Sequence, residues 1–159
     1  MPQIRFLADV PEHADQLADW HHAQWQSLYP DWTHEIARDE LLEHVQCKTL
    51  PTTLVLTEND ALLGSVSLLE IDAESLSHVG SPWLASLYVK PEMRGKGYGV
   101  QLVNALMQHA KSISLREIFL FTPQHKSFYQ QLGWKPLHQA RLNEQNVDVM
   151  NYQIPESVA

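Results

Sequence analysis

The sequence predicts an α/β domain with a mixed β-sheet over residues 1–159, and two observations carry this prediction. Short β-rich runs alternate with longer segments whose apolar residues recur at helical spacing, in the order βααβββαβαββ. Residues 83–89 are apolar almost throughout, which is typical of a central strand covered on both faces. A chain of 159 residues suits one domain and buries a sizeable core without a disulfide or a metal.

The N-terminal part of the chain predicts one strand followed by two helices. Residues 3–8 alternate enough to form the strand. The first helix opens near Pro11, because proline fits a first turn, and Pro30 stops it. The second helix starts after Thr33. Its inner side is expected to carry the apolar residues Ile36, Leu41, Leu42 and Val45.

The middle of the chain predicts a hairpin and a long loop. Residues 52–57 and 61–71 form its two β-rich arms, and the polar residues 58–60 between them suit a tight turn. Residues 72–81 are polar and end in Gly-Ser-Pro, so they are expected to form a loop. Its length suggests a lid or a wall of a functional site.

The C-terminal part predicts alternating helices and strands after a glycine-rich loop at 94–99. Gly133 is expected to lie just past the end of the second helix. In order, we expect a helix over 99–112, a strand over 117–121, a helix over 124–132 and a strand pair at 134–139 and 147–154.

Charge and cysteine content limit the choice of partner and location. The formal net charge of −8 argues against nucleic acid, because phosphate binding requires clustered lysine and arginine. An acidic field favours a cationic ligand such as an amine, although the same charge also keeps a small protein soluble. Cys47 is the one cysteine, and no signal peptide or membrane-spanning run is visible. We therefore expect a cytoplasmic protein with no membrane partner.

The strongest local signal is the segment 88–100, where a buried strand ends, Pro91 breaks it, a glycine-rich turn follows and a helix starts. Such a turn aims backbone N–H groups at one point, and the positive end of the helix dipole adds to their attraction for anions. Arg94 and Lys96 can add charge-assisted hydrogen bonds. The segment predicts a pyrophosphate-binding loop, with a glycine-rich turn that binds no ligand as the alternative.

Two other phosphate-binding motifs are absent. The chain has no Gly-x-x-x-x-Gly-Lys-Ser/Thr sequence. The dinucleotide fingerprint fails because Val100 stands where its third glycine belongs. That fingerprint also expects a carboxylate about 20 residues further on, at a strand end, and residues 119–121 supply none.

Two motifs together resemble the GNAT superfamily of acetyl-CoA-dependent N-acetyltransferases. The first resembles its motif A: Arg94-x-x-Gly97-x-Gly99 after Leu87-Tyr88-Val89-x-Pro91. The second resembles the end of its motif B, Phe-Tyr-x-x-x-Gly-Phe/Trp: Phe128-Tyr129-Gln130-Gln131-Leu132-Gly133-Trp134. The resemblance covers about residues 50–135. It implies a largely antiparallel central sheet with two splayed parallel central strands, flanked by about four helices.

The resemblance implies acetyl-CoA as the co-substrate. In this family a β-bulge opens a gap between the parallel strands, the strand before the loop pairs with the pantetheine arm, and the loop holds the pyrophosphate. Backbone N–H groups of residues 87–89 would polarise the thioester oxygen during direct attack by a neutral amine in a ternary complex. The residues expected to bind acetyl-CoA are Leu87, Tyr88, Val89, Arg94, Gly95, Lys96, Gly97, Tyr98, Gly99 and Phe128.

The resemblance also assigns a catalytic acid but leaves the base open. Tyr129 matches the family tyrosine that protonates the leaving thiolate, and a phenol with a pKa of about 10 stays protonated at neutral pH. Its alternative role is packing or lining the cofactor. Trp83 stands where many members carry a carboxylate, so Glu70, acting through a water, is the expected base. Asp72, His78 or loss of the amine proton to bulk water are further options.

Acceptor binding is expected to involve the first helix and the start of the central strand. Trp25 and Tyr29 are four residues apart, hence on one face, and can pack on a cation; core packing is the alternative. The candidates are His22, Trp25, Tyr29 and Trp83. No metal is expected, because the nine histidines show no zinc-binding spacing, and no motif marks Cys47 as a nucleophile.

The function predicted from the sequence is acetyl transfer from acetyl-CoA to a primary amine of a small molecule or protein that the sequence does not identify. Two alternatives stay open: a non-catalytic acyl-CoA-binding sensor or interaction module, and a nucleotide-binding regulator. A homodimer is also expected from the resemblance.

Overall fold

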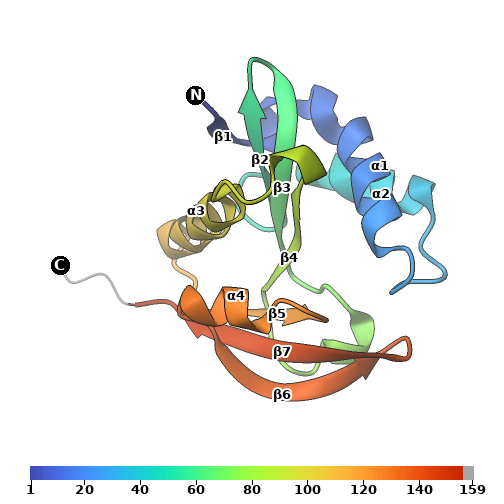
Figure 1. The fold of residues 1–159 in the computed structure, drawn as a ribbon, viewed down its shortest axis with the longest axis vertical. Helices are drawn as coiled ribbons and strands as arrows, with labels where there is room; N and C mark the ends of the chain where they lie inside the picture. The colour runs from blue at the N-terminus through green and yellow to red at the C-terminus, as the bar shows by residue number, and fades with distance from the viewer. Residues whose placement is uncertain (156–159) are drawn as a thin grey trace.

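The computed structural model describes residues 1–155 and confirms the predicted mixed α/β architecture (Figure 1). One seven-stranded sheet has the order β1-β2-β3-β4-β5-β7-β6. Every neighbouring pair is antiparallel except β4 and β5. The strands are β1 (Gln3–Phe6), β2 (Thr52–Glu58), β3 (Ala61–Leu69), β4 (Trp83–Val89), β5 (Glu117–Thr122), β6 (Lys135–Leu142) and β7 (Gln145–Gln153). Residues 156–159 of the predicted domain lie outside the described residues.

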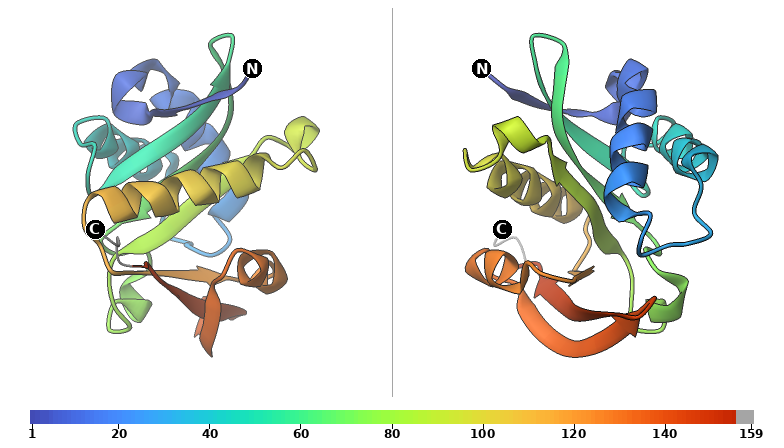
Figure 2. Two further views of the ribbon diagram at one scale, coloured as in Figure 1. Left: turned by 90° about the vertical axis from the view of Figure 1, so that its left-hand side faces the viewer. Right: turned by 45° about the vertical axis from the view of Figure 1, so that its right-hand side comes forward.

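Four α-helices flank the sheet, as the resemblance implied: α1 (Ala14–Trp25), α2 (His34–His44), α3 (Tyr98–Ser112) and α4 (Lys126–Gln131). Helices α1 and α2 lie on one side of the upper half of the sheet, and α3 lies on the opposite side (Figure 2). None of the described helices combines the length and the apolar character that a membrane crossing requires.

Local chemistry explains where several elements start and turn. Thr33 is the N-cap of α2, because its Oγ1 accepts a hydrogen bond from the backbone N–H of Ile36 at 3.1 Å. The β2–β3 hairpin turns at Asn59 and Asp60, whose φ angles of 52° and 66° are left-handed. Asn and Asp tolerate this conformation better than most residues, so the predicted tight turn is confirmed.

The predicted inner side of the second helix is only partly correct. Leu41 is buried and Val45 packs against the core, as predicted, but Ile36 and Leu42 are exposed, at 42% and 37% of their surface. The buried row of α2 also contains Ala37 and His44, which the apolar pattern did not indicate. Apolar character alone therefore misplaced part of the buried face.

The predicted segments end a few residues away from the observed elements. The first strand stops at Phe6 because two short 3-10 turns precede α1. Strand β3 stops at Leu69, two residues before its predicted end, so Glu70 directly follows the strand. The loop 72–81 holds a single 3-10 turn, Glu74–Leu76, whose Leu76 side chain is buried.

The centre of the sheet contains a bulge and a gap. Between β3 and β4 the register shifts: Ser67 pairs with Ala85 and Ser65 pairs with Tyr88, so β4 carries one extra residue opposite β3. On its other side, β4 pairs with β5 only at Trp83 and Phe119 within the described residues. The rest of β4 therefore has a free backbone edge facing the gap, which confirms the predicted splayed parallel strands.

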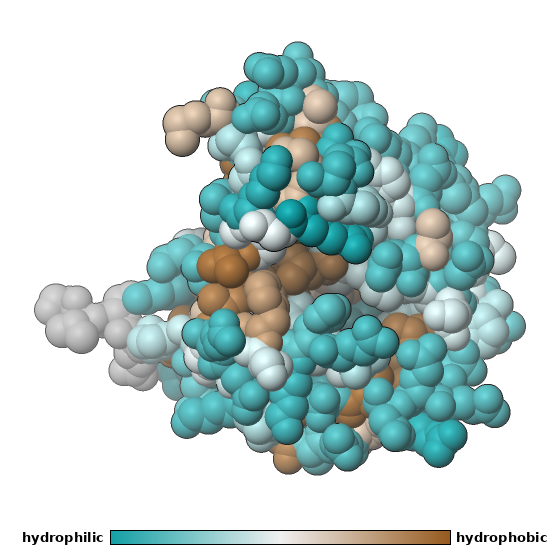
Figure 3. Space-filling view, in the orientation of Figure 1, coloured by the Kyte–Doolittle hydropathy of each residue, from teal (hydrophilic) through white to brown (hydrophobic). Residues whose placement is uncertain are grey.

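Hydrophobic clusters hold both sides of this gap in place. The largest lies between α3 and the sheet and includes Leu102, Leu106 and Trp134. A second joins α1 and α2 to the sheet through Val55 and Leu62. Apolar atoms also gather in a recess between the upper and lower halves of the face in Figure 3. The gap is thus a feature of a packed framework rather than of a loose region.

Candidate active site

The glycine-rich loop has the backbone that the motif predicts. Gly95 and Gly97 have φ angles of 78° and 84°, a left-handed conformation that favours glycine. Gly97 is the N-cap of α3, and the first turn of this 15-residue helix contains no acidic residue. The free N–H groups of that turn and the positive end of the helix dipole suit an anion.

The two basic residues of the loop are placed differently. The Nε of Arg94 donates a hydrogen bond to the Val89 carbonyl at 2.7 Å, and its guanidinium lies 5.4 Å from the centre of the Tyr88 ring. Lys96 is exposed. Arg94 thus braces the end of β4 while its charge stays at the loop, and Lys96 is the cation that is free to reach a ligand.

The predicted acetyl-CoA residues come together around the start of α3. A Cβ placed on Gly99 would meet the Phe128 ring of α4 at 3.5 Å, so the two motifs are neighbours in space. The Tyr88 ring instead packs against Trp20 of α1, with 5.3 Å between ring centres. The Tyr88 ring is therefore used in packing, and only the Tyr88 backbone is available to bind a ligand at the free edge of β4.

A cavity of about 620 Å³ lies where β4 and β5 separate. Residues 84–87 of β4 and residues 120–122 of β5 line it, and Tyr129 of α4 reaches it as well. Five carboxylates also line it, and none of the lining residues is a lysine or an arginine. The carboxylates are Glu40, Glu43, Glu70, Asp72 and Glu74.

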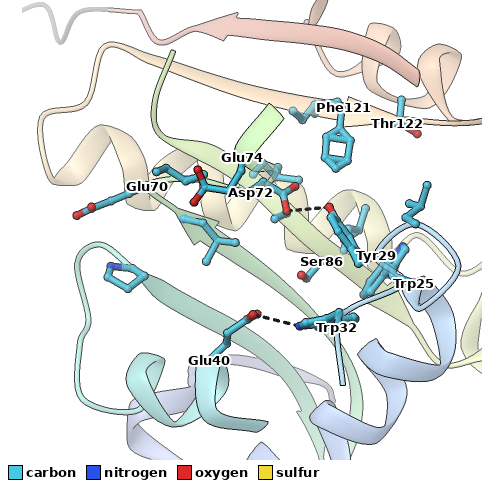
Figure 4. A pocket seen from close by; sticks show the side chains of 18 of the residues that line it. Trp25, Tyr29, Trp32, Glu40, Glu70, Asp72, Glu74, Ser86, Phe121 and Thr122 are labelled. Atoms are coloured by element: carbon cyan, nitrogen blue, oxygen red, sulfur yellow. Dashed lines mark hydrogen bonds between the residues drawn. The ribbon is translucent and has the colours of Figure 1, made fainter. Parts of the chain in front are cut away.

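Aromatic and acidic side chains face each other across this cavity (Figure 4). Tyr29 donates a hydrogen bond to Asp72 Oδ1 at 3.4 Å, and Trp32 Nε1 donates one to Glu40 Oε1 at 3.1 Å. Asp72 and Glu40 lie on opposite sides, with Ser86 of β4 between them. A cationic group that enters the cavity thus meets a carboxylate on each side and the β4 backbone between them.

Burial shifts the protonation of the groups around the cavity. It raises the pKa of Asp72 to about 7, with the nearby charge of Glu40 adding to the rise and the Tyr29 hydrogen bond opposing it. Burial also raises the pKa of Tyr129, and the charge of Asp72 adds to this, so the phenol stays protonated. Asp72 is consequently a carboxylate that exchanges a proton near neutral pH.

The structure brings five predicted site residues to the cavity: Leu87, Trp25, Tyr29, Tyr129 and Glu70. Glu70 is exposed and its carboxylate points away from Asp72 in Figure 4. His78, one of the further options for the base, is exposed and is not among the lining residues. Asp72 therefore combines burial, a hydrogen bond and a raised pKa, whereas Glu70 is exposed to solvent.

Two predicted acceptor residues do not line the cavity. Trp83 is fully buried, its Nε1 donates to the Gly80 carbonyl at 2.9 Å, and its ring packs on Phe119. The prediction that Trp83 contacts the acceptor is therefore wrong, because this position lies where β4 and β5 still pair. His22 bonds the Trp32 carbonyl at 3.1 Å instead and so holds the segment after α1.

Several cavity residues were missed because they come from other parts of the chain. Trp32, Glu40, Glu43 and Glu74 lie on α2 or in loops, at positions where a polar side chain usually means solvent. Glu40 and Glu43 are three residues apart and so share one side of a helix. That spacing is visible in the sequence, but it became informative only once the structure placed this side of α2 at the cavity that β4 also lines.

The possible metal ligands and the cysteine of residues 1–155 lie as follows. Residues 1–155 contain no group of three or more histidine, cysteine, aspartate or glutamate side chains placed to hold a metal ion. Cys47 is a free cysteine, and its Sγ lies 3.3 Å from Thr49 Oγ1. It is not one of the residues that line the cavity.

Comparison with known proteins agrees with this geometry. Residues 14–134 match the model of the acetyltransferase (GNAT) family. A 70-residue stretch, 44% of this chain, is 31% identical to an amino-acid acetyltransferase of Photorhabdus laumondii subsp. laumondii. The matched stretch spans 16% of that relative's length.

Solved structures share the fold along almost the whole chain. An aminoglycoside 6'-acetyltransferase type Ii superposes with a TM-score of 0.74 at 20% identity, covering 98% of this chain and 99% of that one. An aminoglycoside 6'-N-acetyltransferase in complex with coenzyme A also gives a TM-score of 0.74, at 18% identity and 99% coverage of both chains. At such identities the likeness concerns the fold.

Proposed function

Because the chain belongs to the GNAT acetyltransferase family, we propose that it transfers the acetyl group of acetyl-CoA to a primary amine on a cationic acceptor. The observation that carries the acceptor class is the cavity lining, with five carboxylates and no lysine or arginine. Carboxylates and aromatic faces both attract ammonium groups.

Acetyl-CoA is the co-substrate of the family, and the residues here suit it. The pyrophosphate would lie at the N–H groups of residues 95–99, where α3 starts and Lys96 is free. The pantetheine arm would pair with the free edge of β4, and Phe128 would pack against it. The acetyl group would then sit at the gap beside Leu87, which opens into the acceptor cavity.

The proposed reaction needs a base, an oxyanion donor and an acid. Asp72 accepts the proton of the bound ammonium, and the freed nitrogen lone pair attacks the thioester carbon. The backbone N–H of Leu87 stabilises the negative charge that forms on the thioester oxygen. The carbon–sulfur bond then breaks, and the Tyr129 hydroxyl, which is protonated at neutral pH, gives its proton to the departing sulfur as negative charge develops on it. The attacking nitrogen loses its remaining extra proton to solvent, and solvent reprotonates Tyr129.

The choice of Asp72 as the base replaces the sequence-based preference for Glu70. Its raised pKa of about 7 makes proton uptake and release easy at neutral pH, which is what a general base requires. Tyr29 orients the carboxylate through its hydrogen bond. Glu70 instead contributes negative charge at the cavity mouth.

The test is an acetyl-transfer assay with the purified protein. Thiol release measures the rate, and mass spectrometry identifies the product. The panel compares a diamine, a polyamine, a monoamine, an amino acid and a lysine peptide at equal concentrations. We expect turnover with the cationic small amines and weak turnover with the amino acid, whose carboxylate the cavity repels. Calorimetric binding of acetyl-CoA with no turnover on any amine would favour the non-catalytic acyl-CoA-binding module instead.

A cytoplasmic location and a homodimer stay predictions. The single free cysteine, Cys47, supports a reducing compartment. Gel filtration with light scattering measures the oligomeric state directly.

A further inference from the structure

A buried chain of polar groups runs from α1 through β3 to the bulge of β4. Nε2 of His21 on α1 lies 2.9 Å from the hydroxyl of Ser65 on β3. That hydroxyl donates to the carbonyl of Ser86 at 3.4 Å. Ser65 is fully buried and His21 is 3% exposed, so both polar groups depend on these partners.

The direction of each hydrogen bond follows from the chemistry of the groups. A carbonyl oxygen can only accept, so the Ser65 proton is directed to Ser86. The Ser65 oxygen then accepts the N–H of His21, which places the proton of that imidazole on Nε2. Burial lowers the pKa of His21 to about 3, so the imidazole is neutral and stays in the tautomer with its proton on Nε2.

The chain ends on the residue that makes the bulge. Ser86 has a φ of 57°, a left-handed conformation in a residue other than glycine, and it lies within the register shift. Its carbonyl belongs to the same planar peptide group as the N–H of Leu87, and the two point in opposite directions. Holding the Ser86 carbonyl toward Ser65 therefore aims the Leu87 N–H away from Ser65.

We propose that His21 and Ser65 are positioning residues that lock the Ser86–Leu87 peptide group, with the Leu87 N–H aimed into the gap between β4 and β5. Leu87 and Ser86 both line the cavity there. The inference rests on the proposed function, in which this N–H stabilises the oxyanion. A strained backbone held by side chains from another element is a common device for keeping a donor pre-oriented.

The same sheet contains a second histidine–hydroxyl chain that serves as a matched control. His44 Nδ1 lies 2.8 Å from Thr53 Oγ1, which lies 2.8 Å from the hydroxyl of Ser67. Ser67 is as buried as Ser65 and is two residues away on β3. Its hydroxyl partner is a side chain of β2, and it pairs with Ala85, just before the register shift.

The experiment compares Ser65→Ala with Ser67→Ala by steady-state kinetics, thermal unfolding and amide NMR. Both variants lose one buried hydroxyl and should unfold at similar temperatures. For Ser65→Ala we expect kcat to fall about 10-fold or more while the KM for acetyl-CoA stays within about twofold, because a misaligned oxyanion donor acts on the transition state. Ser67→Ala should keep the wild-type kcat within about twofold.

Substitutions at His21 give a second comparison. His21→Gln keeps an N–H near the position of Nε2 and should retain most of the wild-type kcat. His21→Leu removes the donor, and its kcat should fall as far as that of Ser65→Ala. Because both residues act through one chain, the double variant Ser65→Ala with His21→Leu should be no slower than either alone.

The amide NMR resonance of Leu87 reports the position of the Ser86–Leu87 peptide group and does not depend on catalytic turnover. It should shift in Ser65→Ala and in His21→Leu and stay in place in Ser67→Ala. Equal kcat values for the two serine variants, or an unshifted Leu87 resonance in Ser65→Ala, would overturn the inference. Wild-type protein that acetylates no amine would overturn the proposed function instead, and the resonance would still decide whether the lock exists.

Discussion

The two halves of the active site are built in opposite ways. The proposed acetyl-CoA half comes mainly from one continuous stretch, residues 87–99, with Phe128 added from α4. The proposed acceptor half takes side chains from α1 and the segment after it, α2, the loop after β3, β4, β5 and α4, among others. A site made from one stretch leaves a readable motif, whereas a site assembled from many segments leaves scattered residues that look like ordinary surface.

The halves also differ in charge. The loop side offers Arg94, Lys96 and the positive end of α3 to an anion. The acceptor side offers five carboxylates to a cation. A ternary complex of an anionic and a cationic substrate thus fits a site that is divided by charge, and the variants below test each side separately.

The largest expected effect concerns the loop. Gly97→Glu places a side chain at a left-handed residue and a negative charge where the pyrophosphate is expected, so the affinity for acetyl-CoA should fall about 10³-fold or more. Calorimetric titration measures the affinity, with NAD as a ligand that should not bind.

Asn59→Glu is the matched control for this variant. It adds the same charge at another left-handed residue, in the exposed β2–β3 turn. We expect unchanged acetyl-CoA binding. Equal loss of binding in both variants would mean that charge in general, not the loop, determines affinity.

The next effect concerns the acid at the junction of the halves. Tyr129→Phe keeps the ring and its packing but removes the proton donor, so kcat should fall about 10²-fold while the Kd for acetyl-CoA is unchanged. Thiol release gives kcat and calorimetry gives Kd. Wild-type kcat in this variant would remove Tyr129 from the mechanism and leave it a packing role.

The pH dependence distinguishes the two candidate bases. The base must be deprotonated, so kcat/KM should rise with pH through about 7, the pKa to which burial raises Asp72. Asp72→Asn should lower kcat/KM at pH 8 by about 10-fold or more and abolish this rising limb of the pH profile. Glu70→Gln should keep the limb; if it loses the limb and Asp72→Asn keeps it, Glu70 is the base.

The same pKa shift has a consequence for stability. The folded-state pKa of Asp72 lies above the unfolded value of about 3.9, so the folded protein holds this proton more tightly. Its contribution to stability is complete below about pH 4 and is lost as the pH rises through about 7. Asp72→Asn should therefore unfold at a higher temperature than wild type at pH 8, with a smaller difference at pH 4.

The smallest effect concerns acceptor charge. Glu40→Gln removes one carboxylate from the cavity and should raise the KM for a diamine about 3-fold, with little change for a monoamine. Glu35→Gln, on the exposed first turn of α2, is the control and should change neither value. Equal changes in KM for both amines would mean that Glu40 does not recognise a second positive charge.

Prediction from sequence succeeded where local chemistry is decisive. Gly97 and Gly133 are left-handed, as their motifs require, and the turn at Asn59 forms where its residues favour it. Prediction from sequence failed where tertiary packing decides which of several apolar side chains is buried in the core. Ile36 was assigned to the core because it is apolar, yet α2 packs through Ala37, and Trp83 was assigned to the site although it fills the core.

The sequence by itself determined the order of elements and the left-handed glycines of the loop, because each depends on backbone conformations or spacings within a few residues. It also supplied the proposals of an anion-binding loop and of an acid at Tyr129. Only the tertiary structure decided that Asp72 is buried beside Tyr29, that Glu40 faces it across the cavity, and that His21 reaches the β4 bulge through Ser65. Burial and electrostatic coupling between distant segments exist only after folding, and they set the proton affinity and the alignment of the groups that make the site.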